Sequence, residues 1–359
     1  MKRAEKIVDR KGVDRKGVDE KGTPWRLLLW LALLLGGMLA LVHRLGDFES
    51  LLRTLQSAQP LAILVALMLQ VLTLCNQPAL YQALYALLGL PARWRDLAPS
   101  VLAGHFVNVV TPSAGLGGTA LLLDDARRRG WDASRVALAN SLYFLLNFAW
   151  FALLLAAAMV ALWLRHDLKP YEIAASAFLF AGVFIAASAL IVVALRPAAL
   201  EKPLVTMARG INFVAYRVLD RAVWPEEKVR SFALEFSVAV RTLRSARGGL
   251  LRPLFHTFWV DGLEIGVLAA CFAAFPGTGT VSPALVLAGY AIGTLFLIVS
   301  VTPQGLGVVE GVMTATFVSL GVPLERAAVV VLAYRGLSFW LPLGAGFLAA
   351  RHALIKGTH

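Results

Sequence analysis

Long apolar stretches alternate with short polar ones along most of this chain. Six of the apolar stretches have roughly 17 or more nearly uncharged residues, enough for a helix to cross a hydrocarbon layer of about 30 Å. They lie at 27–43, 60–89, 134–164, 171–195, 253–275 and 327–350. The pattern predicts an all-α polytopic membrane protein with six full transmembrane helices.

Two further apolar segments, 97–123 and 281–320, are interrupted by proline and glycine. The interruptions are nearly identical, because VTPSAGLG begins at Val110 and VTPQGLG begins at Val301. Backbone that leaves the helix at membrane depth must be buried in protein or line a wet cavity, since lipid cannot bond its amides. We therefore expect two re-entrant helical hairpins whose breaks lie in the protein interior.

The positions of Lys and Arg support hairpins over single crossings. If both segments turn back, 28 of the 34 basic residues fall on one side of the membrane and five on the other, with Arg335 left inside a span. If each segment crossed once, the eleven basic residues at 196–252 would be external while the tail at 1–26 stayed internal. The positive-inside rule then predicts a multi-pass plasma (inner) membrane protein with both termini in the cytoplasm.

Similarity between the two halves extends beyond the breaks. GWDASRVA, which begins at Gly130, lies 191 residues before GVPLERAA, which begins at Gly321. The expected topology makes the halves, 27–164 and 171–350, antiparallel copies. Such an inverted repeat is common among secondary transporters with sites near the bilayer midplane.

The second half is interrupted by a basic segment at 196–252. Its apolar residues recur with a helical period, while most of its arginines lie elsewhere on the helix. This pattern predicts an amphipathic connector on the cytoplasmic leaflet, held by apolar burial and anionic lipid. A simple packed connector is the alternative.

Composition narrows the classes of function. Hydrophobic residues make up 58% of the chain and the mean hydropathy is +0.71, more than a soluble core needs. The net charge of +12 lies beside the spans, which favours anionic lipid over nucleic acid as its partner. Both cysteines fall inside expected spans, and no metal-ligand, nucleophile or cofactor motif is present, so we expect no metal, no cofactor and no enzyme.

The tail at 1–26 contains VDRKGVDRKGVDEKG, a five-residue unit repeated three times. This composition predicts a disordered, solvated cytoplasmic tail, with lipid contact as the alternative.

Four ionisable residues inside the apolar segments are the candidates for substrate binding or proton coupling. Asp261 and Glu264 lie three residues apart on one helical face near the middle of their span. Glu310 begins the return arm of the second hairpin, and Arg335 lies within the last span. Charges at that depth are costly and face a cavity or a partner, so a cation or proton site and a structural ion pair with Arg335 are both open.

The two breaks suggest a second kind of site. A helix N-terminus at membrane depth attracts anions such as lipid phosphate, although glycines there also serve close helix packing. The residues concerned are Pro112, Gly115, Gly117, Thr119, Pro303, Gly305 and Gly307. Asn76, Asn108 and Asn147 add supporting polar atoms, with interhelical hydrogen bonding as the alternative role.

NVVTPSAGLGG followed by RRRG, and TPQGLGVVEG followed by YRG, resemble the flippase-like family named for the transmembrane region of lysylphosphatidylglycerol synthase. The resemblance covers about 27–350 and matches Pro303, Gly305, Gly307, Glu310 and Arg335 to the second motif. It implies a protein that moves lipids or lipid-linked headgroups between leaflets. In the first motif Thr119 and leucines stand where relatives often carry a glutamate and an arginine, so only one half keeps its acid.

The leading hypothesis is a lipid translocator in which a headgroup enters between opposed hairpins while its chains stay in the bilayer. The alternative is a non-transporting scaffold or regulator of lipid or envelope biosynthesis that binds lipid or a biosynthetic enzyme through Arg241, Arg244 and Arg247. An intramembrane hydrolase using Asp261 and Glu264 lacks a nucleophile or metal set. Larger relatives add an aminoacyltransferase domain, and nothing after Arg351 matches one, so we do not expect synthase activity.

Overall fold

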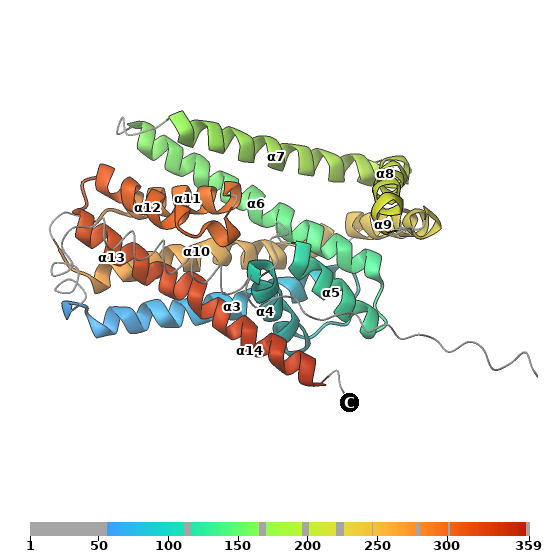
Figure 1. Ribbon diagram of the computed structural model, residues 1–359, viewed down its shortest axis with the longest axis horizontal. Helices are drawn as coiled ribbons and strands as arrows, with labels where there is room; N and C mark the ends of the chain where they lie inside the picture. Colours follow the sequence, from blue (N-terminus) through green and yellow to red (C-terminus); the bar gives the residue numbers. More distant parts are fainter. Residues whose placement is uncertain are drawn as a thin grey trace, which may run out of the picture.

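The structure is a computed structural model that describes residues 56–110, 116–164, 170–195, 201–219, 226–245, 247–277, 281–300 and 302–356. All regular elements within these ranges are helical (Figure 1). The predicted tail at 1–26, the first predicted span at 27–43, and Pro112 and Gly115 of the first break lie outside the described residues.

Long apolar helices dominate the described chain. They are α3 (Pro60–Leu87), α6 (Ala133–Leu164), α7 (Pro170–Leu195), α10 (Leu251–Ala274) and a final rod made of α13 (Leu324–Arg335), a π-helical turn (Gly336–Trp340) and α14 (Leu341–Lys356). Among the described residues, α3, α6, α10 and the rod from Leu324 to Arg351 are long and apolar enough to cross a membrane. The prediction of a multi-pass, all-helical membrane protein is therefore confirmed, and α7 is a 26-residue helix at a fifth predicted span.

Each interrupted segment forms two helices that pack side by side. The first pair is α4 (Trp94–Val110) and α5 (Leu116–Arg128), and the second is α11 (Pro283–Val299) and α12 (Val308–Ser319), with the short turn η3 (Pro303–Gly305) between them. Glycine allows close packing in both pairs: a Cβ added to Gly104 would lie 3.4 Å from the Cα of Gly118, and one added to Gly293 would overlap Met313. Helix-packing glycines therefore occur within the arms of both hairpins.

Helices α3 and α10 lie against each other and run in opposite directions. The backbone N–H of Gln59, before α3, donates to the carbonyl of Ala274 at the end of α10, at 2.8 Å. Farther along, Asn76 of α3 bonds to His256 near the start of α10. Residue number rises along one helix as it falls along the other, so the pair is antiparallel.

The turn that closes each hairpin recurs 191 residues later. Gly130 follows α5 with φ 68°, and Gly321 follows α12 with φ 88°, a backbone region that favours glycine. In both turns the residue after the glycine donates a backbone hydrogen bond to a carbonyl of the preceding helix. The Trp131 N–H donates to the Ala126 carbonyl at 2.8 Å, and the Val322 N–H donates to the Phe317 carbonyl at 3.0 Å. The two halves thus share local geometry as well as sequence.

An arginine after each of these turns binds the end of the long helix of its own half. Arg135 donates to the Leu88 carbonyl at the end of α3. Arg326, 191 residues later, donates to the carbonyls of Phe275 and Gly277 at the end of α10, at 2.8 and 3.2 Å. A cation at a helix C-terminus satisfies carbonyls that have no intrahelical partner.

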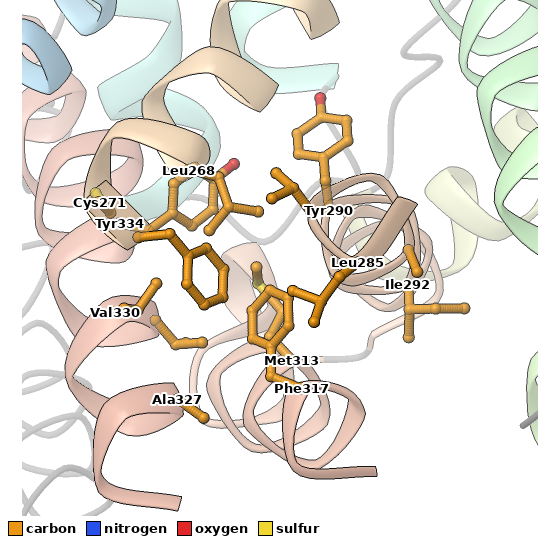
Figure 2. Packing of buried hydrophobic residues seen from close by; sticks show 14 of the residues in the cluster. Leu268, Cys271, Leu285, Tyr290, Ile292, Met313, Phe317, Ala327, Val330 and Tyr334 are labelled. Carbon is orange, nitrogen blue, oxygen red and sulfur yellow. The ribbon is translucent and has the colours of Figure 1, made fainter. Parts of the chain in front are cut away.

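The apolar core has two parts. The larger part joins α10, α11, α12 and α13, where Leu268, Ile292 and Phe317 are fully buried (Figure 2). Burying a large apolar side chain contributes about 1.5–3 kcal/mol in water, whereas helix packing within lipid relies more on van der Waals fit. The smaller part lies within residues 80–142 and joins α3, α4, α5 and α6.

The basic connector is two helices, α8 (Glu201–Leu219) and α9 (Glu226–Ser245), where the sequence pattern predicted one. Arg209 of α8 pairs with Glu226 of α9 at 2.9 Å, and the hydrogen bond from Arg209 lowers the pKa of Glu226. Helix α9 also contacts α6 and α7 (Figure 1).

Candidate functional site

One buried and one half-buried carboxyl group lie between α3, α10, α11 and α13. Asp261 of α10 is 6% exposed and accepts a hydrogen bond from the Tyr290 hydroxyl of α11 at 2.5 Å. Glu264, one turn on, accepts from Gln70 Nε2 of α3 and from the Tyr334 hydroxyl of α13, each at 3.1 Å. Figure 2 shows Tyr290 and Tyr334 reaching out of the apolar cluster from α11 and α13. Neutral donors from three neighbouring helices therefore hold both carboxyl groups.

The register of α3 on α10 places Gln70 opposite Glu264. Close contact is possible nearby because Gly266 carries no side chain, and a Cβ there would lie 3.2 Å from a methyl carbon of Leu69. Within the described ranges, neither Asp261 nor Glu264 takes part in an ion pair. The predicted pairing of Arg335 with an acid is thus made with neither of these two.

Arg335 pairs with Glu310 instead. Arg335 Nε lies 2.7 Å from Glu310 Oε1, and the two side chains are 7% and 12% exposed. The same guanidinium donates through Nη2 to the Gln304 carbonyl at 2.9 Å and lies over the Phe339 ring. Glu310 Oε2 accepts the N–H of Gly307 at 2.7 Å, so the pair fastens the end of α13 to the break of the second hairpin.

The second break depends on left-handed backbone. Gln304, Gly305 and Gly307 have φ of 51°, 66° and 79°, where a residue with a Cβ costs roughly 1–2 kcal/mol. A Cβ on Gly305 would also lie 2.4 Å from Val309 Cγ2 and 3.3 Å from the Cα of Leu297. Gly305 is therefore required by both conformation and space, whereas Gly307 is required by conformation only. Pro303 begins this turn.

The first break is closed by a neutral group. Asn108 Oδ1 of α4 accepts the N–H of Gly118 in the first turn of α5 at 2.7 Å. Gly117 and the half-buried Thr119 lie in the same turn. Thr119 stands where α12 carries Glu310, so the two breaks differ in charge. In this structure the amides of Gly118 and Gly307 already have protein acceptors, with which a phosphate would compete.

The two hairpins touch, because α4 of the first contacts η3 of the second. The other predicted polar residues serve local structure. Asn76 donates to the His256 carbonyl at 2.8 Å and bonds His256 Nδ1 at 2.7 Å, which joins α3 to α10. Asn147 donates to the Tyr143 carbonyl of its own helix at 2.7 Å. The contacts of Asn76 are interhelical hydrogen bonds, whereas the bond of Asn147 stays within its own helix.

Gln70 was not among the residues that the sequence analysis singled out. The available signal was the repeat spacing, since Gln70 lies 191 residues before Asp261 and Thr73 lies 191 before Glu264. The positions that carry acids in α10 therefore carry neutral polar residues in α3.

The model of the lysylphosphatidylglycerol synthase TM region matches residues 28–346 of this chain. A UPF0104 membrane protein from Methanothermobacter thermautotrophicus is 26% identical over 309 residues, which is 85% of this chain and 88% of the relative. A UPF0104 membrane protein from Methanocaldococcus jannaschii is 25% identical over 319 residues, 87% of this chain and 90% of that relative. The residues matched by the family model therefore span both interrupted segments, Asp261, Glu264 and Arg335 of this chain.

Proposed function

Because the chain belongs to the family of the lysylphosphatidylglycerol synthase TM region, we propose that it is a lipid translocator. It would move a phospholipid or a lipid-linked polar headgroup between leaflets without covalent chemistry. The acyl or prenyl chains stay in the bilayer while the headgroup passes through the protein interior.

The proposal includes an inverted repeat with two re-entrant hairpins, six crossing helices and both termini in the cytoplasm. It is supported by the antiparallel packing of α3 on α10 and by the recurring glycine turns and arginines. Helix α12 has 12 residues, about 18 Å at ~1.5 Å per residue, which is too short to cross a layer of about 30 Å.

The observation that carries the proposal is the buried Glu310–Arg335 pair at the second break. Buried ion pairs are often no more stabilising than apolar residues of similar volume, so a pair at membrane depth favours a functional role. A guanidinium binds phosphate and carboxylate oxygens in the same two-pronged manner. A headgroup phosphate that displaces Glu310 from Arg335 would release the break from α13.

We also propose that α8 and α9 lie on anionic lipid at the cytoplasmic surface. Leu234 and Val238, one turn apart on α9, are 59% and 60% exposed although α9 is rich in charge. Apolar side chains exposed on a charged helix suit the boundary between headgroups and acyl chains. The same surface would serve a lipid-biosynthetic enzyme as partner.

Leaflet exchange in proteoliposomes tests the translocator. Fluorescent lipids with anionic, aminoacylated and polyprenyl phosphate headgroups are compared for the wild type, Glu310→Gln and Arg335→Ala, with the exposed Asp124→Asn as matched control. We expect one headgroup class to cross faster with the wild type and the control, and the gain to be lost in both pair variants. Full exchange by folded Glu310→Gln, or no gain for any headgroup, would overturn the proposal and favour the scaffold.

A further inference from the structure

We propose that Asp261, Glu264, Gln70 and Thr257 form a binding site for a small inorganic cation between α3 and α10. This site is distinct from the Glu310–Arg335 pair. It does not depend on lipid transport, because it follows from charge and hydrogen bonding around the two carboxyl groups.

Within the described ranges, neither carboxyl group is hydrogen-bonded or ion-paired to a cationic side chain. Every hydrogen bond described above to Asp261 and Glu264 comes from a neutral amide or hydroxyl group. The buried arginines of the described ranges are engaged elsewhere, Arg335 with Glu310 and Arg326 with the carbonyls that end α10. Two carboxylates on successive turns repel each other when both are ionised, so at least one of them must take up a proton or bind a cation at this depth.

An unpaired oxygen beside the carboxyl groups indicates where such a cation would bind. Gln70 is fully buried, and its Nε2 donates to Glu264 while its Oε1 has no hydrogen-bond partner. Buried acceptors are rarely left unpaired in folded proteins. The nitrogen and the oxygen of an amide group are about 2.3 Å apart. Because Gln70 Nε2 bonds to Glu264, the unpaired Gln70 Oε1 therefore lies within a few ångströms of the Glu264 carboxylate.

Thr257 adds a second unpaired oxygen on the same face. It lies four residues before Asp261, is 1% exposed, and its Oγ1 has no partner. Carboxylate, amide and hydroxyl oxygens are the ligands that hard cations prefer. A lone proton needs fewer acceptors than this set supplies, so the oxygens also suit a metal ion such as Na⁺.

The residues around these oxygens hold them in place. Tyr290 of α11 and Tyr334 of α13 donate to the carboxylates, as outer residues commonly do for metal ligands. Thr73 of α3 bonds the Leu69 carbonyl of its own helix. The cation would therefore take oxygens from both halves of the molecule, Gln70 from one and Asp261, Glu264 and Thr257 from the other.

The test measures cation binding without any lipid assay. Purified protein in nanodiscs of fixed composition is melted at constant ionic strength while N-methylglucamine is replaced by Na⁺, K⁺, Mg²⁺ or Ca²⁺. A parallel infrared titration follows the carbonyl band of protonated carboxyl groups. The variants are Gln70→Met, which keeps volume, and Asp261→Asn with Glu264→Gln, with the exposed Glu227→Gln as control.

If the ligand is a metal ion, one ion raises the melting temperature of the wild type and of Glu227→Gln in a saturable manner. Gln70→Met then binds it about tenfold or more weakly, and the double variant does not respond. If the ligand is a proton, no metal ion acts, and the infrared band titrates in the wild type but is absent from the double variant. Absence of both responses, a Gln70→Met variant that binds the metal ion as tightly as the wild type, or a double variant that responds as the wild type does, would refute the site. Cation binding without lipid exchange would refute only the translocator.

Discussion

Replacing both members of the Glu310–Arg335 pair separates stability from function. In Arg335→Met the Glu310 carboxylate, 12% exposed, loses its counter-charge and keeps only the Gly307 N–H. Removing one partner of a buried pair costs about 3–5 kcal/mol. Glu310→Gln should lower the unfolding free energy less, by about 1–3 kcal/mol, because its amide oxygen can still accept a hydrogen bond from Gly307 or from Arg335.

The double variant Glu310→Gln, Arg335→Met leaves neither charge buried. We expect its unfolding free energy to lie within about 1–2 kcal/mol of the wild type, which makes the coupling energy about 2–7 kcal/mol. Reversible unfolding in mixed micelles, followed by tryptophan fluorescence, gives all four values of the cycle. Leaflet exchange is then measured on the same samples.

A structural pair and a functional pair differ in the double variant. If the pair only holds α13 to the break, the double variant regains lipid exchange between leaflets as it regains stability. If Arg335 meets the headgroup, the double variant is stable and inactive, as we expect. The reasoning about the pair would be refuted by a double variant as unstable as Arg335→Met, because the two charges would then not be coupled.

Three further outcomes follow from the structure. Gly305→Ala should lower the unfolding free energy by about 2–4 kcal/mol, because the new Cβ would have a positive φ and would contact Val309. Gly307→Ala should lower it by only about 1–2 kcal/mol, because nothing lies within 4 Å of the new Cβ. Equal losses in thermal melts would show that the contact with Val309 is unimportant. Arg326→Met should cost about 2–4 kcal/mol, since it removes charge-assisted bonds to the end of α10, and hydrogen exchange should rise at residues 271–277 before it rises elsewhere. Leu234→Ser with Val238→Ser should weaken binding of an α8–α9 peptide to anionic vesicles by about tenfold or more without changing its charge, and unchanged binding would argue against an interfacial α9.

The long apolar helices of the described residues and the interruptions of the two shorter apolar segments were predictable because they depend on local properties. A run such as 60–89 is readable from apolar length alone, and the breaks from proline and glycine at repeated positions. The recurring GWDASRVA and GVPLERAA segments also marked the equivalent arginines, although their bonds to helix ends became visible only in the structure.

The site could be predicted only in part because its contacts depend on how distant helices pack. Three acids were candidate ion-pair partners of Arg335. Glu310 is the partner because α12, which begins just before it, packs against α13. Gln70 pairs with Glu264 because α3 and α10 are antiparallel in one particular register, which no local pattern encodes. The capping of Gly118 by Asn108 was likewise invisible, since ten residues and a break separate them.

The difference between Thr119 and Glu310 leaves the two breaks held by contacts of unequal strength. Opening the first breaks the neutral hydrogen bond between Asn108 and Gly118, worth about 1 kcal/mol, while opening the second separates a buried ion pair. A difference of about 2 kcal/mol changes an opening equilibrium roughly 30-fold. Under the translocation that we propose, the contact at the first break therefore opens more readily than the one at the second, and a headgroup phosphate bound to Arg335 lowers the free energy needed to open the second.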